Sequence, residues 1–186
     1  MKIYFSSSMR AKKIYKDAFQ KIYCIVKDLG YKHTSDFLLK ANADEFYHRT
    51  PGEEKAFYHK MVSQIKSADV CVFEVSRHSL GIGYSVNLAL DFGKPVLLLH
   101  EAGRRPYLFS AIKSDRLRML EYNQADLKEV LADALEEAKN NIDIRFTFFV
   151  TPKINHFLRH IAKTKKIPRA VYIRHLLERE MKRENF

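Results

Sequence analysis

The chain has 186 residues, of which 46% are hydrophobic and 12% aromatic, so it can form one ordinary domain with a small second module and is not a disordered chain. Its 33 Lys and Arg against 22 Asp and Glu leave a formal net charge of +11. The segment 141–186 alone holds 11 basic and 4 acidic side chains, which favours a nucleic-acid partner for that segment over a membrane.

Two further features concern the cellular setting. The longest apolar run is far shorter than the ~20 residues of a membrane-spanning helix, and residues 1–9 lack the apolar core of a signal peptide. Cys24 and Cys71 lie in apolar stretches and are expected to be reduced core residues. We therefore predict a cytoplasmic protein without a membrane partner, a metal site or a cofactor.

Apolar patterning predicts alternating strands and helices as far as residue 140. Short apolar runs bounded by turns indicate strands, and apolar residues recurring at helical spacing indicate helices. Segment 36–52 is polar and irregular. In chain order we expect a strand at 2–6, a helix at 11–29, a strand at 31–34, a helix at 53–67, a strand at 69–75, a helix ending at 91, a strand at 96–99, a helix at 107–114, a strand at 118–121 and a helix at 124–140. This alternation predicts an α/β fold: a Rossmann-like open parallel sheet with helices on both faces.

A different pattern begins at residue 141. It predicts one strand at 145–151, with alternating side chains, and two amphipathic helices at 152–165 and 168–183. The expected domains are therefore 1–140 and 141–186.

Two loops of the first domain have the composition of a phosphate site. Ser6-Ser7-Ser8-Met9-Arg10 follows the first strand, and Ser79-Leu80-Gly81-Ile82-Gly83 precedes a helix. Open parallel sheets bind ligands at the carboxyl ends of their strands, where hydroxyls, a guanidinium and helix N-terminal amides can hold an anion. A tight turn with no ligand would give a similar pattern.

The same loops carry a family resemblance. Residues 68–99, ADVCVFEVSRHSLGIGYSVNLALDFGKPVLLL, resemble the core of the nucleoside 2-deoxyribosyltransferase superfamily, closest to its 2'-deoxynucleoside 5'-monophosphate N-glycosidase branch. The opening KIYFSSSMR is similar to the K-I-Y-F-x-G-S-I-R loop of that branch, and 107–113 resemble the loop through which a neighbouring subunit completes the site. The resemblance implies a nucleotide-binding role for Tyr4, Ser8, Arg10, Ser79, Gly81, Gly83 and Ser110.

The departures from that family concern its catalytic residues. The position of the family's nucleophilic glutamate holds Ser85, and that of its catalytic aspartate holds Met61. Retaining cleavage of a glycosidic bond needs a carboxylate nucleophile. These replacements predict a domain that binds nucleotide without catalysis, with Glu74 as a weak candidate for a displaced catalytic carboxylate.

The C-terminal segment resembles the ribbon-helix-helix repressor domain. Its strand, helix, short turn and helix follow the pattern of that family, with Lys166 in place of the turn glycine. Such a small unit cannot bury a core alone, so two chains are expected to pair their strands in a homodimer, with assembly of dimers into a tetramer left open. The resemblance implies double-stranded DNA as a partner, contacted by Arg145, Thr147, Phe149, Lys165, Lys166 and Arg169.

Three functions fit these patterns. The leading hypothesis is a DNA-binding transcriptional regulator with a nucleotide-sensing, catalytically degenerate first domain. The alternative is an active nucleoside or nucleotide N-glycosidase or deoxyribosyltransferase with a C-terminal assembly module. The third treats the first domain as an oligomerisation platform only.

Overall fold

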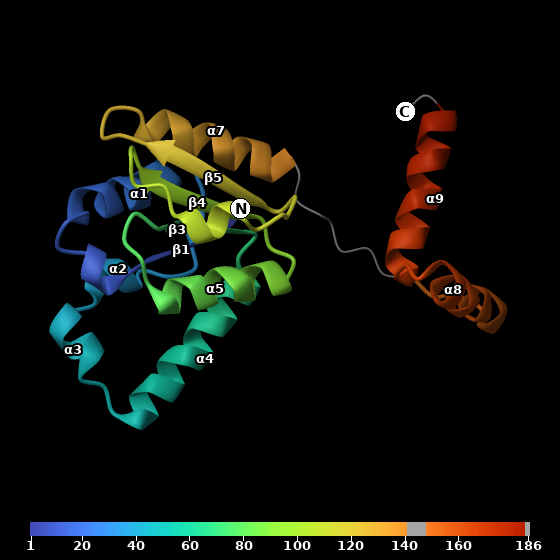
Figure 1. Cartoon of the computed structure of the whole chain (residues 1–186), viewed down its shortest axis with the longest axis horizontal. Coiled ribbons are helices and arrows are strands. Elements are labelled where there is room, and N and C mark those ends of the chain that lie inside the picture. Colours follow the sequence, from blue (N-terminus) through green and yellow to red (C-terminus); the bar gives the residue numbers. More distant parts are fainter. Residues whose placement is uncertain (141–147, 185–186) are drawn as a thin grey trace. The chain divides into compact units, whose positions relative to one another are not determined.

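The computed structural model describes residues 1–140 and 148–184, with the side chains of residues 43, 44 and 140 outside the description. The chain divides into two compact units, Met1–Asp143 and Ile144–Phe186, each described here by itself (Figure 1). No helix in the described ranges is long and apolar enough to cross a membrane. The cytoplasmic location stays a prediction.

The first unit is built on a parallel sheet of five strands in the order β2-β1-β3-β4-β5. The strands are β1 (Lys2–Ser7), β2 (Lys32–His33), β3 (Val70–Glu74), β4 (Val96–Glu101) and β5 (Leu117–Tyr122). The central pairing aligns Ser7 of β1 with Glu74 of β3, so both strands end at the same level. The chain order reverses between β1 and β3, and in such sheets ligands bind at this point.

Helices cover both faces of the sheet (Figure 1). One core lies against α1 (Lys16–Asp28) and α7 (Leu127–Asn140), and it includes Ile3 and Phe5 of β1. The other lies against α4 (Pro51–Ser67) and α5 (Leu80–Asp91), and it includes Tyr4. Successive strand residues point to opposite faces, and because both faces are covered the three central strands have continuous apolar stretches: Ile3–Phe5 in β1, Val70–Phe73 in β3 and Val96–Leu99 in β4. The predicted α/β class and Rossmann-like sheet are confirmed.

Local signals explain where the helices near the site begin. Thr50 and Glu53 form a reciprocal capping box at α4, and Pro51 occupies the first turn, where its missing N–H costs nothing. Ser79 caps α5, because its Oγ accepts a hydrogen bond from the Ile82 amide at 3.4 Å.

Three details differ from the sequence expectation. Segment 36–52 contains two short helices, α2 (Phe37–Lys40) and α3 (Ala43–Tyr47), because half-buried aromatic side chains that pack against one another hold a segment whose composition predicts a loop. The predicted helix at 107–114 is only the single turn α6 (Tyr107–Ser110). Cys24 is exposed, whereas Cys71 is buried as predicted.

The second unit contains α8 (Pro152–Lys165) and α9 (Arg169–Arg183), close to the predicted helices. Thr151 caps α8, and the turn between the helices places Lys166 at a φ of 54°, a left-handed conformation that favours glycine. Of the predicted strand, residues 145–147 lie outside the described residues and 148–150 have no regular secondary structure. A ribbon-helix-helix domain therefore stays a prediction.

Candidate functional site

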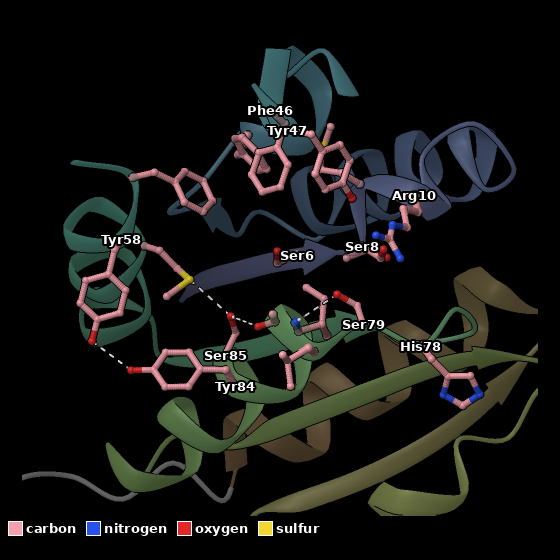
Figure 2. Close-up of a pocket in the computed structure, with 18 of the residues that line it drawn as sticks. Ser6, Ser8, Arg10, Phe46, Tyr47, Tyr58, His78, Ser79, Tyr84 and Ser85 are labelled. Atoms are coloured by element: carbon pink, nitrogen blue, oxygen red, sulfur yellow. Dashed lines mark hydrogen bonds between the residues drawn. The ribbon is translucent and has the colours of Figure 1, made fainter. Parts of the chain in front are cut away.

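A pocket of about 520 Å³ opens where β1 and β3 end, between the two phosphate-type loops (Figure 2). It lies on the α4 and α5 side of the sheet and has a polar end and an aromatic end. Its walls come from the loop after β1, from α2 to α4, and from the start of α5. Segments far apart in the sequence therefore meet at the point where the strand order reverses.

The polar end is formed by the loops after β1 and before α5. Ser8 is buried at the start of the short 3-10 helix η1 (Met9–Ala11), and Arg10 lies beside it with its guanidinium 5.8 Å from the centre of the Tyr47 ring (Figure 2). Across the pocket, Ser79 and Gly81 stand at the N-terminus of α5. Two hydroxyls, a guanidinium and a helix N-terminus facing one space form a good anion site.

The aromatic end is formed by Phe37, Phe46, Phe57 and Tyr47. The first three rings pack within 5.5 Å of one another, centre to centre, and the guanidinium of Arg49 lies 4.3 Å from the Phe57 ring centre. Aromatic faces of this kind can stack on a nucleobase. This aromatic end of the pocket, called the aromatic wall below, was not predicted from the sequence, although the density of Phe and Tyr in segment 37–58 is a signal that could have indicated it.

The deep wall brings together the two positions singled out for their missing carboxylates. Ser85 Oγ lies 3.3 Å from Met61 Sδ and 2.9 Å from the Gly81 carbonyl oxygen (Figure 2). Nearby, the Tyr58 and Tyr84 hydroxyls lie 2.9 Å apart, and this hydrogen bond raises the pKa of Tyr84. Among the side chains that the structure describes, none lining the pocket is a carboxylate.

Tyr4 lines the same wall from β1. Its ring packs edge-on against Phe73 at 5.8 Å, and burial raises its pKa to about 12. The phenol is therefore neutral near neutral pH and can donate a hydrogen bond to a ligand.

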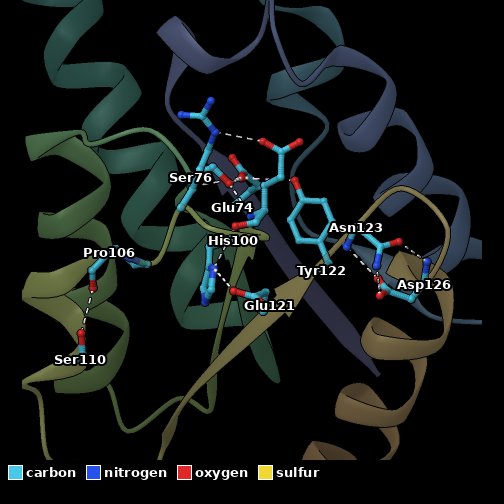
Figure 3. Close-up of polar contacts among 11 residues, drawn as sticks. Glu74, Ser76, His100, Pro106, Ser110, Glu121, Tyr122, Asn123 and Asp126 are labelled. Carbon is cyan, nitrogen blue, oxygen red and sulfur yellow. Dashed lines mark hydrogen bonds and ion pairs between the residues drawn. The ribbon is translucent and has the colours of Figure 1, made fainter.

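Glu74 is the last residue of β3, and its carboxylate lies near Ser76 and Tyr122 (Figure 3); Tyr122 belongs to the core on the α1 and α7 face of the sheet. The Glu74 side chain is completely buried. Its carboxylate accepts hydrogen bonds from Ser7 Oγ and the Ser76 amide, each at 3.1 Å, and from the Tyr122 hydroxyl at 3.4 Å. Burial raises its pKa, while hydrogen bonds from Ser76, Ser7 and Tyr122 partly oppose the shift. Because side chains alternate along β3, Glu74 points away from the wall holding Ser85, so as a catalytic candidate it has no direct access to the pocket.

The seven residues assigned a nucleotide role by resemblance divide into two groups. Five line the pocket: Tyr4, Ser8, Arg10, Ser79 and Gly81. Gly83 does not line it and lies inside α5, where its amide bonds to the Ser79 carbonyl oxygen. The Ser110 hydroxyl donates within its own turn, to the Tyr107 carbonyl oxygen at 2.9 Å.

The residues assigned to DNA contact lie in the second unit. Arg145 and Thr147 fall outside the described residues, and Phe149 is fully exposed. Lys165 Nζ lies 5.6 Å from the centre of the Tyr172 ring, next to the left-handed Lys166. Arg169 donates to Asn155 Oδ1 at 3.0 Å and so ties α9 to α8.

No protein-family profile matches the chain. It is 27% identical to the 5-hydroxymethyl-dUMP N-hydrolase of Tetraodon nigroviridis over 143 residues, 75% of this chain and 100% of the relative. It is 26% identical to the Homo sapiens protein of the same name over 143 residues, 73% of this chain and 79% of the relative. The structure of a Clostridium botulinum CMP N-glycosidase, with 14% identity and a TM-score of 0.51, covers 74% of this chain and 99% of that one.

These similarities define the class of the chain. The structural match shows an α/β Rossmann-like fold, and the sequence matches show similarity to proteins named as nucleotide N-hydrolases. The fold that the two loops predicted by resemblance is therefore confirmed, and membership of the family stays a prediction that these matches support.

The comparisons also correct the functional interpretation. The relatives are named as N-hydrolases and the structural neighbour as an N-glycosidase, which points to an enzyme. The interpretation as a DNA-binding transcriptional regulator with a catalytically degenerate domain is therefore wrong, and the alternative of an N-glycosidase is better supported. That interpretation rested on Ser85 and Met61, which hold the positions of the family's two catalytic carboxylates.

Proposed function

We propose that the protein hydrolyses the N-glycosidic bond of a nucleoside 5'-monophosphate and releases the free base. One observation carries this proposal. A single pocket of nucleotide size has an anion site at one end and an aromatic wall at the other, on a fold shared with N-glycosidases. The names of the relatives favour a pyrimidine nucleotide as the substrate. With the phosphate at the polar end of the pocket, the base would lie on the aromatic wall.

The phosphate would lie at the polar end. Arg10 can donate two parallel hydrogen bonds to phosphate oxygens, and the Ser8 and Ser79 hydroxyls flank the same space. The N-terminus of α5 adds its dipole, and Gly81 has only the Ser79 hydroxyl, at 4.0 Å, near the place a Cβ would occupy. A phosphate oxygen can therefore approach the helix backbone closely.

The scissile bond would then lie between these ends, above Ser85 and Met61. In the hydrolysis, water attacks the anomeric carbon as the carbon–nitrogen bond breaks. The bonding electron pair leaves with the base nitrogen, the base takes up a proton, and the sugar keeps the hydroxyl. Because no described side chain of the lining can form a glycosyl ester, we favour direct attack by water over a transfer reaction that would store a covalent glycosyl intermediate.

The pocket hydroxyls would assist this reaction. Ser85 and Tyr4 supply hydroxyls at the deep wall, and the more exposed Tyr58–Tyr84 pair supplies two more nearby, so these groups can orient water or the leaving base. The aromatic wall excludes bulk water from the developing cation and strengthens these interactions.

The test is release of base from a panel of deoxyribonucleoside and ribonucleoside monophosphates, separated by chromatography. We expect release from at least one nucleotide and a drop of about 100-fold in kcat/KM for Arg10→Ala, since a charge-assisted phosphate contact contributes about 1.5–3 kcal/mol. The matched control is Arg118→Ala. This substitution also removes an arginine, but Arg118 of β5 lies at the surface, where it forms an ion pair with Glu137 of α7. Nucleotide binding without any base release would contradict the proposal.

For the second unit, we propose pairing with a second copy of the chain, in the manner of the ribbon-helix-helix family. Of the apolar side chains on α8 and α9, only Leu158 is buried, whereas Ile154, Phe157 and Leu177 are about half exposed or more. A unit of this size needs a partner to bury such side chains.

A further inference from the structure

A second cavity, of about 540 Å³, adjoins the polar end of the nucleotide pocket. Four arginines line it: Arg10 after β1, Arg77 after β3, and Arg104 and Arg105 after β4. Within the described residues its lining contains no carboxylate. Three neighbouring strands thus direct guanidinium groups into one space at the carboxyl edge of the sheet.

The charges of this cavity are only partly compensated. Arg104 Nε lies 3.1 Å from Glu101 Oε2, and Arg10 stacks over Tyr47. Arg77 and Arg105 are exposed and form no ion pair with any residue in the described ranges. Like charges that line one cavity repel one another, and a bound anion would relieve that repulsion.

The loop after β4 is shaped to present two of these arginines. Gly103 has a φ of 75°, a conformation that a side chain disfavours, and the Arg104 amide donates to the Glu101 carbonyl oxygen at 2.9 Å. This tight turn places Arg104 and Arg105 together on the rim of the cavity.

The cavity is continuous with the nucleotide pocket. Arg10 and His78 line both cavities. A ligand whose first phosphate lies between Ser8, Ser79 and Arg10 would therefore extend its next phosphate past Arg10 toward Arg77 and Arg105. Planar guanidinium forks match phosphate oxygens two at a time.

We propose that this arginine cavity is a second phosphate subsite and that the protein binds nucleoside 5'-diphosphates more tightly than the corresponding monophosphates. This inference rests on the proposed nucleotide site and extends its ligand class beyond monophosphates.

The test is isothermal titration calorimetry of the full chain with dUMP, dUDP and inorganic pyrophosphate. We expect dUDP to bind about tenfold more tightly than dUMP, the gain from one additional charge-assisted contact. Arg77→Gln combined with Arg105→Gln should abolish most of this preference. Lys27→Gln combined with Lys128→Gln, which removes the same charge from exposed positions of α1 and α7, should keep it.

The outcomes separate the subsite from the function. Equal affinity of the unaltered protein for dUMP and dUDP, or an equal loss of both in the arginine variant, would overturn the subsite while leaving the nucleotide site intact. If neither nucleotide binds but pyrophosphate does, and the arginine variant loses it, the anion subsite stands and the proposed function fails.

Discussion

At the scale of residues, two features define the pocket: side chains that can bind a phosphate, and a described lining that contains no carboxylate. Arg10, Ser8 and Ser79 supply phosphate contacts, whereas Ser85 and Met61 touch each other at the deep wall without a carboxylate. Binding and chemistry therefore depend on different residues. Substitutions can separate them.

Restoring carboxylates to the deep wall should accelerate base release. We expect Met61→Asp combined with Ser85→Glu to raise kcat by at least about tenfold, because a carboxylate can trap or stabilise the developing cation at the anomeric carbon. The neutral pair Met61→Asn and Ser85→Gln controls for shape. Equal rates for the two double variants would show that a carboxylate at this wall contributes nothing.

Glu74 should make stability depend on pH. Its pKa is raised in the folded protein, so the stability that its protonated form contributes is complete below the unfolded pKa and is lost as the pH rises through the folded pKa. As the pH rises above about 4, the usual range of a free glutamate, the free energy of unfolding should fall more in the unaltered protein than in Glu74→Gln. Urea denaturation at several pH values measures this. Parallel curves for the two proteins would argue against a raised pKa.

At the scale of elements, the sequence predicted the apolar strands and long helices well, because their periodicity reflects burial directly. β3 and β4 lie within two residues of their expected limits, and α8 matches its range. Segment 36–52 was harder, since α2 and α3 depend on distant aromatic contacts such as Phe46 with Phe57. The aromatic wall of the pocket was missed for the same reason.

A substitution at the start of α5 should change the stability of the protein and its affinity for nucleotide in opposite directions. Gly81 lies in the first turn of the helix and lines the pocket, and a Cβ there would meet no protein atom closer than 4.0 Å. Gly81→Ala should therefore stabilise the protein by about 0.5–1 kcal/mol while weakening nucleotide binding. Thermal unfolding and calorimetry measure the two effects. Unchanged nucleotide affinity would place the phosphate away from this helix terminus.

At the scale of the whole molecule, the resemblance of the loops led to the correct fold, but two replaced residues led to the wrong functional prediction. The loops around Arg10 and Gly81 could be recognised because phosphate binding restricts their residue types locally. Whether Ser85 can assist hydrolysis depends on a wall assembled from α3, α4 and α5, which local patterns do not reveal.

Assembly should depend on the second unit. Leu177 on α9 is 60% exposed, and a charge there would disfavour its burial against a second copy. We expect Leu177→Glu to reduce the molar mass measured by sedimentation, whereas Glu178→Gln on the same helix should not. An unchanged mass for Leu177→Glu would place the contacts between copies elsewhere.

The central claim is that this pocket cleaves a nucleotide and uses its phosphate to do so. The most direct measurement follows dUMP and deoxyuridine by proton NMR in parallel samples of the full chain. We predict that free uracil and deoxyribose 5-phosphate accumulate from dUMP while deoxyuridine stays intact, because only the nucleotide can contact Arg10, Ser8 and Ser79. Persistence of both compounds, or cleavage of both at the same rate, would contradict the account.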